Sequence, residues 1–203
     1  LESKTLQMAL ESPYTAQQLA KSTKQLAAFR IETHKLYDTT KMLADVAAGL
    51  GVDQERLNLA YGHTKASGFL RGMYARQFAT AGVNIYGELA EYYSKAEKKL
   101  ISFSEVYERI SKKQVKFEDV EAVFKKLTSN GGAFYNMQLN MTNTLQGQIN
   151  KLKDAYAQLL NKIGKQNEGA LKGGVNILLE MVRNWRAVLN VIEIVGGSAM
   201  MAV

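Results

Sequence analysis

The chain has 203 residues, of which 46% are apolar and 22% are charged. That apolar fraction is enough for a hydrophobic core, so composition excludes a disordered chain. The absence of cysteine excludes disulfide frameworks and zinc sites with thiolate ligands. With 26 Lys and Arg against 19 Asp and Glu, the net charge is +7, which raises the question of an anionic partner such as nucleic acid or a membrane surface.

The lysines do not form one basic stretch, and six of them occur in three adjacent pairs. The pairs are Lys98-Lys99, Lys112-Lys113 and Lys125-Lys126. Each lies near the end of a predicted helix, where a cation complements the helix dipole and stays solvated. Solvated helix ends are therefore expected, and no specific nucleic-acid binding is predicted.

Long helices are possible after the start of the chain, because the single proline is Pro13. Thr15 followed by Gln18 has the spacing of a capping box, in which a hydroxyl and an amide side chain satisfy free amides of the first turn. This spacing predicts a helix from about Thr15 toward Phe29.

Glycines and caps divide the next part of the chain into short helices. An apolar stripe predicts a second helix that ends at Gly49 and Gly51, and Asp53 is positioned to cap a third, before Gly68 and Gly72 break the pattern. A short fourth helix follows. The stripe of the second helix comprises Leu36, Leu43, Val46 and Leu50.

Three further short helices are predicted after Gly82, which has the position of a helix terminus. The first buries Ile85, Leu89 and either Tyr92 or Tyr93. The second starts at a capping box formed by Ser102 and Glu105, and the third starts at Glu118, Asp119 and Glu121 and closes on Lys125-Lys126.

The last seventy residues have a different pattern, with apolar residues about every 3.6 positions from Phe134 to Ile163. One straight helix explains this period, and at about 1.5 Å per residue it would be about 45 Å long. The stripe consists of Phe134, Met137, Met141, Leu145, Ile149, Leu152, Tyr156, Leu159 and Ile163.

A final helix carries two apolar stripes. A heptad seam runs from Leu171 to Ile192, and a second stripe from Ile177 to Val195 is rotated by about 100°. One face can pack on the preceding helix. The other needs another copy of the chain, a downstream segment or a membrane, and the sequence leaves these alternatives open.

These patterns predict an all-α fold, a multi-helix bundle with several short helices followed by two long antiparallel helices. Two domains are expected: a helical domain of short helices over residues 1–132, and a long helical hairpin over residues 133–203. Because the sequence starts without Met and stops within an apolar run, we expect the hairpin to continue into a longer chain.

No catalytic, cofactor-binding or metal-ligating residue is predicted, so we expect a protein that is not an enzyme. His34 and His63 lie in no metal-binding motif, and exposed or capping roles are expected for both. Glu88 and Glu91 lie one helical turn apart without a further acid or histidine, which favours surface charges. The pair Gly131-Gly132 lacks the Lys-Ser/Thr of a phosphate loop and is expected to form a turn with positive φ.

An ordered series of short segments resembles the conserved domain of tail tape measure proteins from tailed phages and prophages. In the first half they are residues 43–52 (LADVAAGLGV), 70–79 (LRGMYARQFA), 81–85 (AGVNI) and 89–90 (LA). In the second half they are 117–120 (FEDV), 127–128 (LT), 131–134 (GGAF), 136–137 (NM), 144–147 (TLQG), 152–154 (LKD) and 163–164 (IG). None is diagnostic alone; their order and spacing carry the resemblance.

The resemblance implies an elongated helical structural protein that determines tail length during assembly and leaves the tail before or with DNA ejection. The expected location is the virion tail, and the host cytoplasm before assembly. The expected partners are tail tube, tail tip and tail assembly chaperone proteins, together with copies of the chain that associate through the C-terminal helices. No cofactor and no catalytic residue are carried over.

Two rival functions stand beside this one. The charge and the apolar stretch after Ala187 favour a membrane-active helical protein in DNA ejection or pore formation. That stretch is interrupted by Asn190 and Glu193 and is shorter than the ~20 residues needed to span, so membrane contact is expected only through segments beyond this sequence. A cell-wall hydrolase would need an assembled pair of acids.

Overall fold

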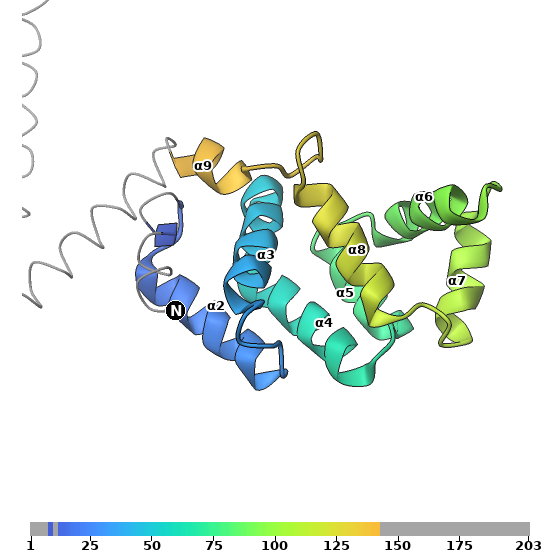
Figure 1. The fold of residues 1–203 in the computed structure, drawn as a ribbon, viewed down its shortest axis with the longest axis horizontal. Coiled ribbons are helices and arrows are strands. Elements are labelled where there is room, and N and C mark those ends of the chain that lie inside the picture. Colours follow the sequence, from blue (N-terminus) through green and yellow to red (C-terminus); the bar gives the residue numbers. More distant parts are fainter. Residues whose placement is uncertain (1–7, 10–11, 143–203) are drawn as a thin grey trace, which may run out of the picture. The chain divides into compact units, whose positions relative to one another are not determined.

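The computed structural model describes residues 8–9 and 12–142, which belong to one compact unit. This part of the chain is helical, and its only β pairing is an isolated bridge between Phe69 and Lys116 (Figure 1). The helices are α2 (Ala16–Ala28), α3 (Leu36–Leu50), α4 (Gln54–Ser67), α5 (Gly72–Thr80), α6 (Ile85–Glu97), α7 (Phe103–Ser111), α8 (Phe117–Thr128) and α9 (Met137–Thr142). The predicted all-α class is confirmed for the described residues.

The caps that the sequence predicts form at the starts of α2 and α4. The Thr15 hydroxyl accepts from the Gln18 amide at 3.2 Å, and the Gln18 side chain accepts from the Thr15 amide at 2.8 Å. At α4, the Asp53 carboxylate accepts from the Glu55 amide at 3.0 Å. Each cap satisfies amides that the first turn of a helix leaves without a partner.

The predicted helix ends are also confirmed where glycine takes a left-handed backbone. Gly51 ends α3 with φ +66°, Gly68 ends α4 with φ +75°, and Gly82 follows α5 with φ +93°. Residues with a Cβ are disfavoured in this conformation, so glycine fixes these boundaries.

The larger of two apolar clusters extends from α2 to α8 and contains aromatic side chains from three helices. Tyr61 of α4 makes edge-on contacts with Phe117 and Phe124 of α8, with ring centroids 5.1 and 5.7 Å apart. Phe78 of α5 packs against Phe124 at 5.1 Å. All but Phe117 are less than 2% exposed. Such large buried side chains dominate the apolar area removed from water, and hence the stability of the unit.

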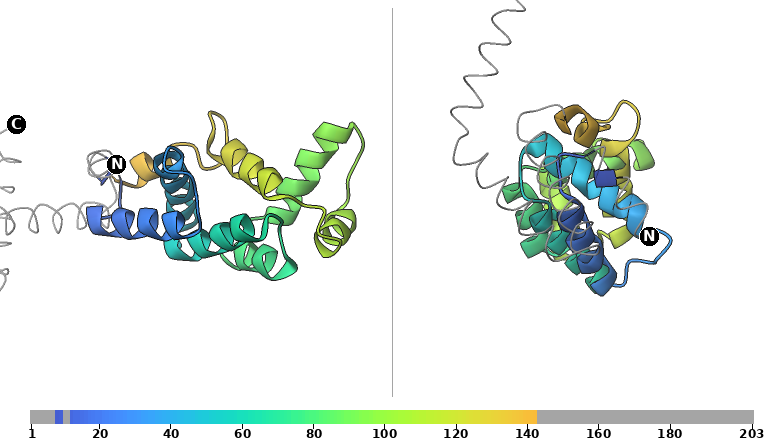
Figure 2. Two further views of the ribbon diagram at one scale, coloured as in Figure 1. Left: turned by 60° about the horizontal axis from the view of Figure 1, so that its bottom comes forward. Right: turned by 90° about the vertical axis from the view of Figure 1, so that its left-hand side faces the viewer.

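The elements are arranged so that α2, α3 and α9 lie at one end of the unit and α6 and α7 at the other (Figures 1 and 2). Helices α4, α5 and α8 lie between them. At the first end, the ring of Phe29 lies directly against Gly62 of α4, where any side chain would overlap it. This close approach joins the end of α2 to α4.

The helix predicted to start at Phe134 begins three residues later, at Met137. The Gly131-Gly132 pair forms the expected turn, with φ +82° at Gly131, but Asn136 also has a positive φ of 50°. A left-handed residue cannot continue a right-handed helix, so Phe134 lies in the turn. From residue 143 onward, the predicted long helices lie outside the described residues, and the division at residue 132 stays a prediction.

Candidate functional site

The first candidate site is the junction between α3 and α9, where a carboxylate of one helix caps the other. Asp45 lies in the middle of α3 and is 2% exposed. One of its oxygens accepts from the backbone amide of Gln138 at 3.0 Å, and the other pairs with the ammonium of Lys41 at 2.9 Å. Gln138 is the second residue of α9, so its amide is one of those that a helix start leaves unsatisfied. The negative charge also complements the positive end of the α9 dipole.

A further hydrogen bond fixes the orientation of α9 at this junction. The side-chain amide of Gln138, a residue 3% exposed, donates to the backbone carbonyl of Lys41 at 3.0 Å. Main chain and side chain of one α9 residue are thus bound to two positions one turn apart on α3. Buried polar groups need such partners, because an unpaired one costs about 1–3 kcal/mol.

Apolar contacts complete the junction on the other side of α9. The Phe134 ring packs against the core and lies over Gly49, where an added Cβ would be 2.5 Å from Phe134 Cδ1 and 3.1 Å from Met137 Cγ. These are the first two residues of the apolar stripe predicted from the sequence. The predicted apolar stripe therefore begins with residues that pack against α3. Leu139, which faces outward, is 52% exposed.

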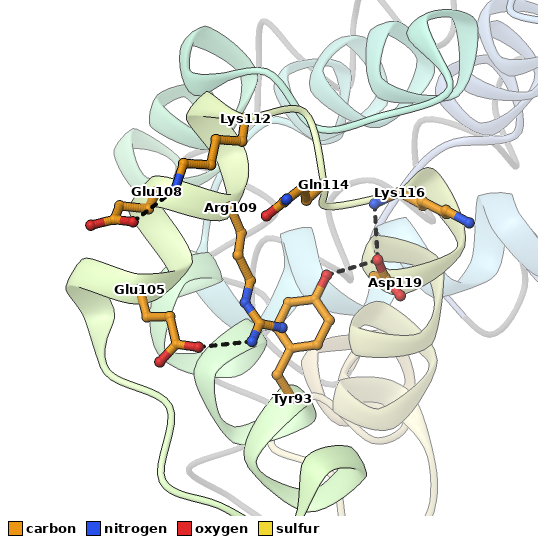
Figure 3. A pocket seen from close by; sticks show the side chains of 8 residues that line it. All are labelled: Tyr93, Glu105, Glu108, Arg109, Lys112, Gln114, Lys116 and Asp119. Atoms are coloured by element: carbon orange, nitrogen blue, oxygen red, sulfur yellow. Dashed lines mark hydrogen bonds and ion pairs between the residues drawn. The ribbon is translucent and has the colours of Figure 1, made fainter.

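The second candidate site is a polar hollow of about 540 Å³ bounded by α6, α7 and the start of α8 (Figure 3). The guanidinium of Arg109 lies 4.6 Å from the centroid of the Tyr93 ring and forms two bonds to Glu97, at 2.5 and 3.0 Å. It also donates to Glu105 at 2.8 Å. The Tyr93 hydroxyl donates to Asp119 at 2.8 Å. The lining residues are Tyr93, Glu105, Glu108, Arg109, Lys112, Gln114, Lys116 and Asp119.

Hydrogen bonds and burial at this hollow shift the pKa values of three of the groups around Arg109, namely Glu97, Glu105 and Tyr93. Hydrogen bonds from Arg109 hold the pKa values of Glu97 and Glu105 below the usual range. Burial, together with the bond to Asp119, raises the pKa of Tyr93. A general acid or base works best with a pKa moved toward neutrality, and these pKa values move away from it. The arrangement is suited to holding α6 against α7 and α8.

The chain matches the family model of the tape measure protein over residues 1–165. This range covers most of the chain and includes both residues of the α3–α9 junction. The chain belongs to the tape measure protein family. No curated protein and no solved structure matches it.

Two acids of this tape measure family member that the sequence predicts as surface charges, Glu88 and Glu91, lie at the surface and also connect two helices. Glu88 and Glu91 of α6 both pair with Lys126 of α8, at 3.1 and 2.6 Å. The hydrogen bond from Lys126 and a second one from Lys95 lower the pKa of Glu91 to about 2. The sequence predicted surface charges without this contact, and it placed Lys126 at a solvated helix end.

The two histidines have different environments. His34 is exposed, as expected. His63 departs from the expected exposed or capping role, because it is half-buried between aromatic rings, stacked on Tyr74 at 5.3 Å and edge-on to Phe29 at 4.9 Å. Within residues 8–9 and 12–142, no group of three or more potential acidic or histidine ligands could hold a metal ion.

The same described part of the chain contains no helix with the length and apolar character to cross a membrane. The apolar stretch after Ala187, on which the membrane-active alternative depends, lies outside the described residues.

Sequence reasoning missed the junction itself, because its partners are 93 residues apart. One signal was present in the sequence: Asp45 is the only polar residue in the run from Met42 to Ala48. A carboxylate within such a segment needs a partner. Residue spacing could not predict that this partner is a backbone amide far away in the sequence.

Proposed function

We propose that this tape measure family member is a structural scaffold of tail assembly that sets tail length through its helical residues. It acts without catalysis. The observation that supports a scaffold role most directly is the α3–α9 junction, in which Asp45 and Gln138 fix the start of a helix on a compact unit. A helix with a fixed origin and a constant rise converts a number of residues into a length.

The proposed partners follow from the same role. Tail tube, tail tip and tail assembly chaperone proteins would contact the chain, and copies of the chain would associate through the two-stripe helix predicted near the C-terminus. Sedimentation at increasing protein concentration tests the self-association. A monomer at all concentrations would remove this part of the proposal.

The ruler is tested by lengthening the predicted helix in the phage or prophage gene. Two further copies of residues 143–160 add about ten helical turns, or about 54 Å at about 1.5 Å per residue. Electron microscopy of the assembled tails should show them longer by about that amount. Tails of unchanged length, from cells in which the longer protein is present and incorporated, would contradict the ruler.

A control separates length from general damage to the protein. Replacing the exposed Asp38 by Ala changes no residue count and no junction contact, so these tails should keep the wild-type length. The absence of catalysis is tested separately, by incubating the purified chain with peptidoglycan. Release of soluble fragments would contradict this part of the proposal.

A further inference from the structure

Two loops that are distant in sequence are held side by side by backbone hydrogen bonds. The amide of Leu70, between α4 and α5, donates to the carbonyl of Val115 at 2.8 Å. The amide of Phe117 donates back to Gly68 at 3.1 Å. These bonds form the antiparallel bridge that pairs Phe69 with Lys116. The backbone segments that carry the side chains of the two loops are therefore held in a fixed relative position.

Two cations lie over the ring of Phe69, and a third is paired with Phe69 in the bridge; we name these three the Phe69 cation cluster: Arg71, Lys113 and Lys116. The guanidinium carbon of Arg71 lies 5.3 Å from the centroid of the Phe69 ring, and the ammonium of Lys113 lies 5.6 Å from the same centroid. Lys116 is opposite Phe69 in the bridge. All three cations are exposed, and none of them forms an ion pair with another residue that the structure describes.

Two neighbouring cations on and just after α7 differ in this respect. Lys112, the residue before Lys113, pairs with Glu108 at 3.1 Å, and Arg109 pairs with Glu97 and Glu105. Carboxylates are thus available near these loops and are bound elsewhere. Like charges held close together repel one another, and an anion among them relieves that repulsion.

We propose that the Phe69 cation cluster binds an acidic segment of a partner polypeptide, whose carboxylates pair with the three cations and whose apolar side chain packs on Phe69. Arginine binds carboxylates through two parallel hydrogen bonds, and an aromatic ring adds apolar contact area. This inference rests on the proposed assembly role and adds the chemistry by which one assembly partner would be recognised.

The surroundings of the cluster favour a short acidic peptide over a nucleic acid. A duplex presents a continuous row of phosphates and needs cations along its length. Here the exposed Glu118 and the adjacent Asp119 follow Lys116 closely in the chain, and Glu105 and Glu108 line the neighbouring hollow. These carboxylates would repel a backbone that extends past the cluster, whereas a short segment can place its acids among the cations alone.

The test compares two triple variants of the 203-residue chain by fluorescence anisotropy. The probe is a fluorescein-labelled, acetylated and amidated peptide of four glutamates around one phenylalanine. The site variant carries Arg71→Gln, Lys113→Gln and Lys116→Gln. The control carries Lys24→Gln, Arg30→Gln and Lys98→Gln, which removes one Arg and two Lys that are likewise exposed. Circular dichroism establishes that both variants fold.

The site variant should bind the peptide about tenfold more weakly than the wild type, and the control within about twofold, because charge pairs contribute modestly and locally. Equal weakening in both variants, or no binding by the wild type, would overturn the proposal. The proposal would also be overturned if the wild type bound a duplex of about 20 base pairs more tightly than the peptide and the site variant lost that binding. This result would indicate a nucleic-acid site. None of these results changes the expected tail lengths, so the ruler is judged independently.

Discussion

The two ends of the described unit use ion pairs in opposite settings. At the α3–α9 junction, the carboxylate of Asp45 is 2% exposed and lies beside the Phe134 and Met137 contacts with Gly49. At the other end, pairs such as Lys99–Glu105, which joins the loop after α6 to α7, remain open to solvent. Large apolar side chains are also exposed there, namely Leu100 at 92%, Phe103 at 59% and Tyr107 at 65%. Loss of an ion-pair partner should therefore lower the free energy of unfolding strongly at the buried first end and only slightly at the solvent-exposed second end.

The largest effect is expected from Asp45→Ala. It leaves the buried Gln138 amide without its acceptor and Lys41 without its partner, so the free energy of unfolding should fall by about 3 kcal/mol. Urea denaturation measures this change. The matched control Asp38→Ala removes an exposed carboxylate of the same helix and should stay within about 0.5 kcal/mol of the wild type. Equal losses in the two variants would show that burial of Asp45 contributes nothing.

The apolar side of the junction is tested by Gly49→Val. A side chain at this position overlaps the Phe134 ring, so we expect a loss of about 2 kcal/mol in the free energy of unfolding. Gly72→Val is the control, because nothing lies within 4 Å of a Cβ at Gly72. If Gly49→Val unfolds at the same urea concentration as the wild type, Phe134 does not pack there.

Local rules of sequence reading predicted most of the described fold. The capping residues Thr15 and Asp53 and the left-handed glycines Gly51 and Gly68 act within one turn of their own helix, so spacing alone locates them. The late start of α9 was missed, because the positive φ of Asn136 depends on how Phe134 and Met137 fit against α3.

The candidate sites were predictable only to the extent that they are local. Asp45 and Gln138 are 93 residues apart, and Phe69 meets Lys116 only through a backbone bridge between two loops. Likewise, Lys126 fits the rule for a helix end, but its partners Glu88 and Glu91 lie on another helix. Contacts of this kind depend on the packing of helices, which periodicity and capping do not specify.

At the other end of the unit, Arg109→Gln should have a smaller effect, about 1 kcal/mol, because its pairs with Glu97 and Glu105 are partly solvated. The difference from the wild type should shrink in about 1 M NaCl, where exposed charges are screened. Urea titrations at low and high salt measure both values. A loss as large as that of Asp45→Ala, unaffected by salt, would contradict the contrast between the two ends.

Acid should lower the stability of the fold by breaking the surface ion pair between Lys126 and Glu91. The folded-state pKa of Glu91 is lowered from 4.5 to about 2, so its contribution to stability is present above about pH 4.5 and is lost as the pH falls toward 2. Lys126→Met removes the main cause of this shift. The drop in Tm between about pH 5 and pH 2.5 should therefore be smaller in this variant than in the wild type. Lys98→Met, which alters an exposed lysine, should retain the wild-type drop.

The smallest effect is expected for the exposed apolar residues of α7. Phe103→Ser combined with Tyr107→Ser should change the free energy of unfolding by no more than about 0.5 kcal/mol, because both residues are already mostly exposed to water. Urea denaturation of the double variant tests this. A substantial loss would mean that the two rings are covered in solution.

Amide hydrogen exchange at Gln138 tests most directly whether α9 is anchored on α3. In the wild type, this amide should exchange at least about a hundredfold more slowly than in an unstructured peptide, because it is buried and bound to Asp45. In Asp45→Ala that protection should be lost, while the core amide of Phe124 keeps its own. Unprotected exchange at Gln138 in the wild type would contradict the anchored junction and the scaffold role built on it.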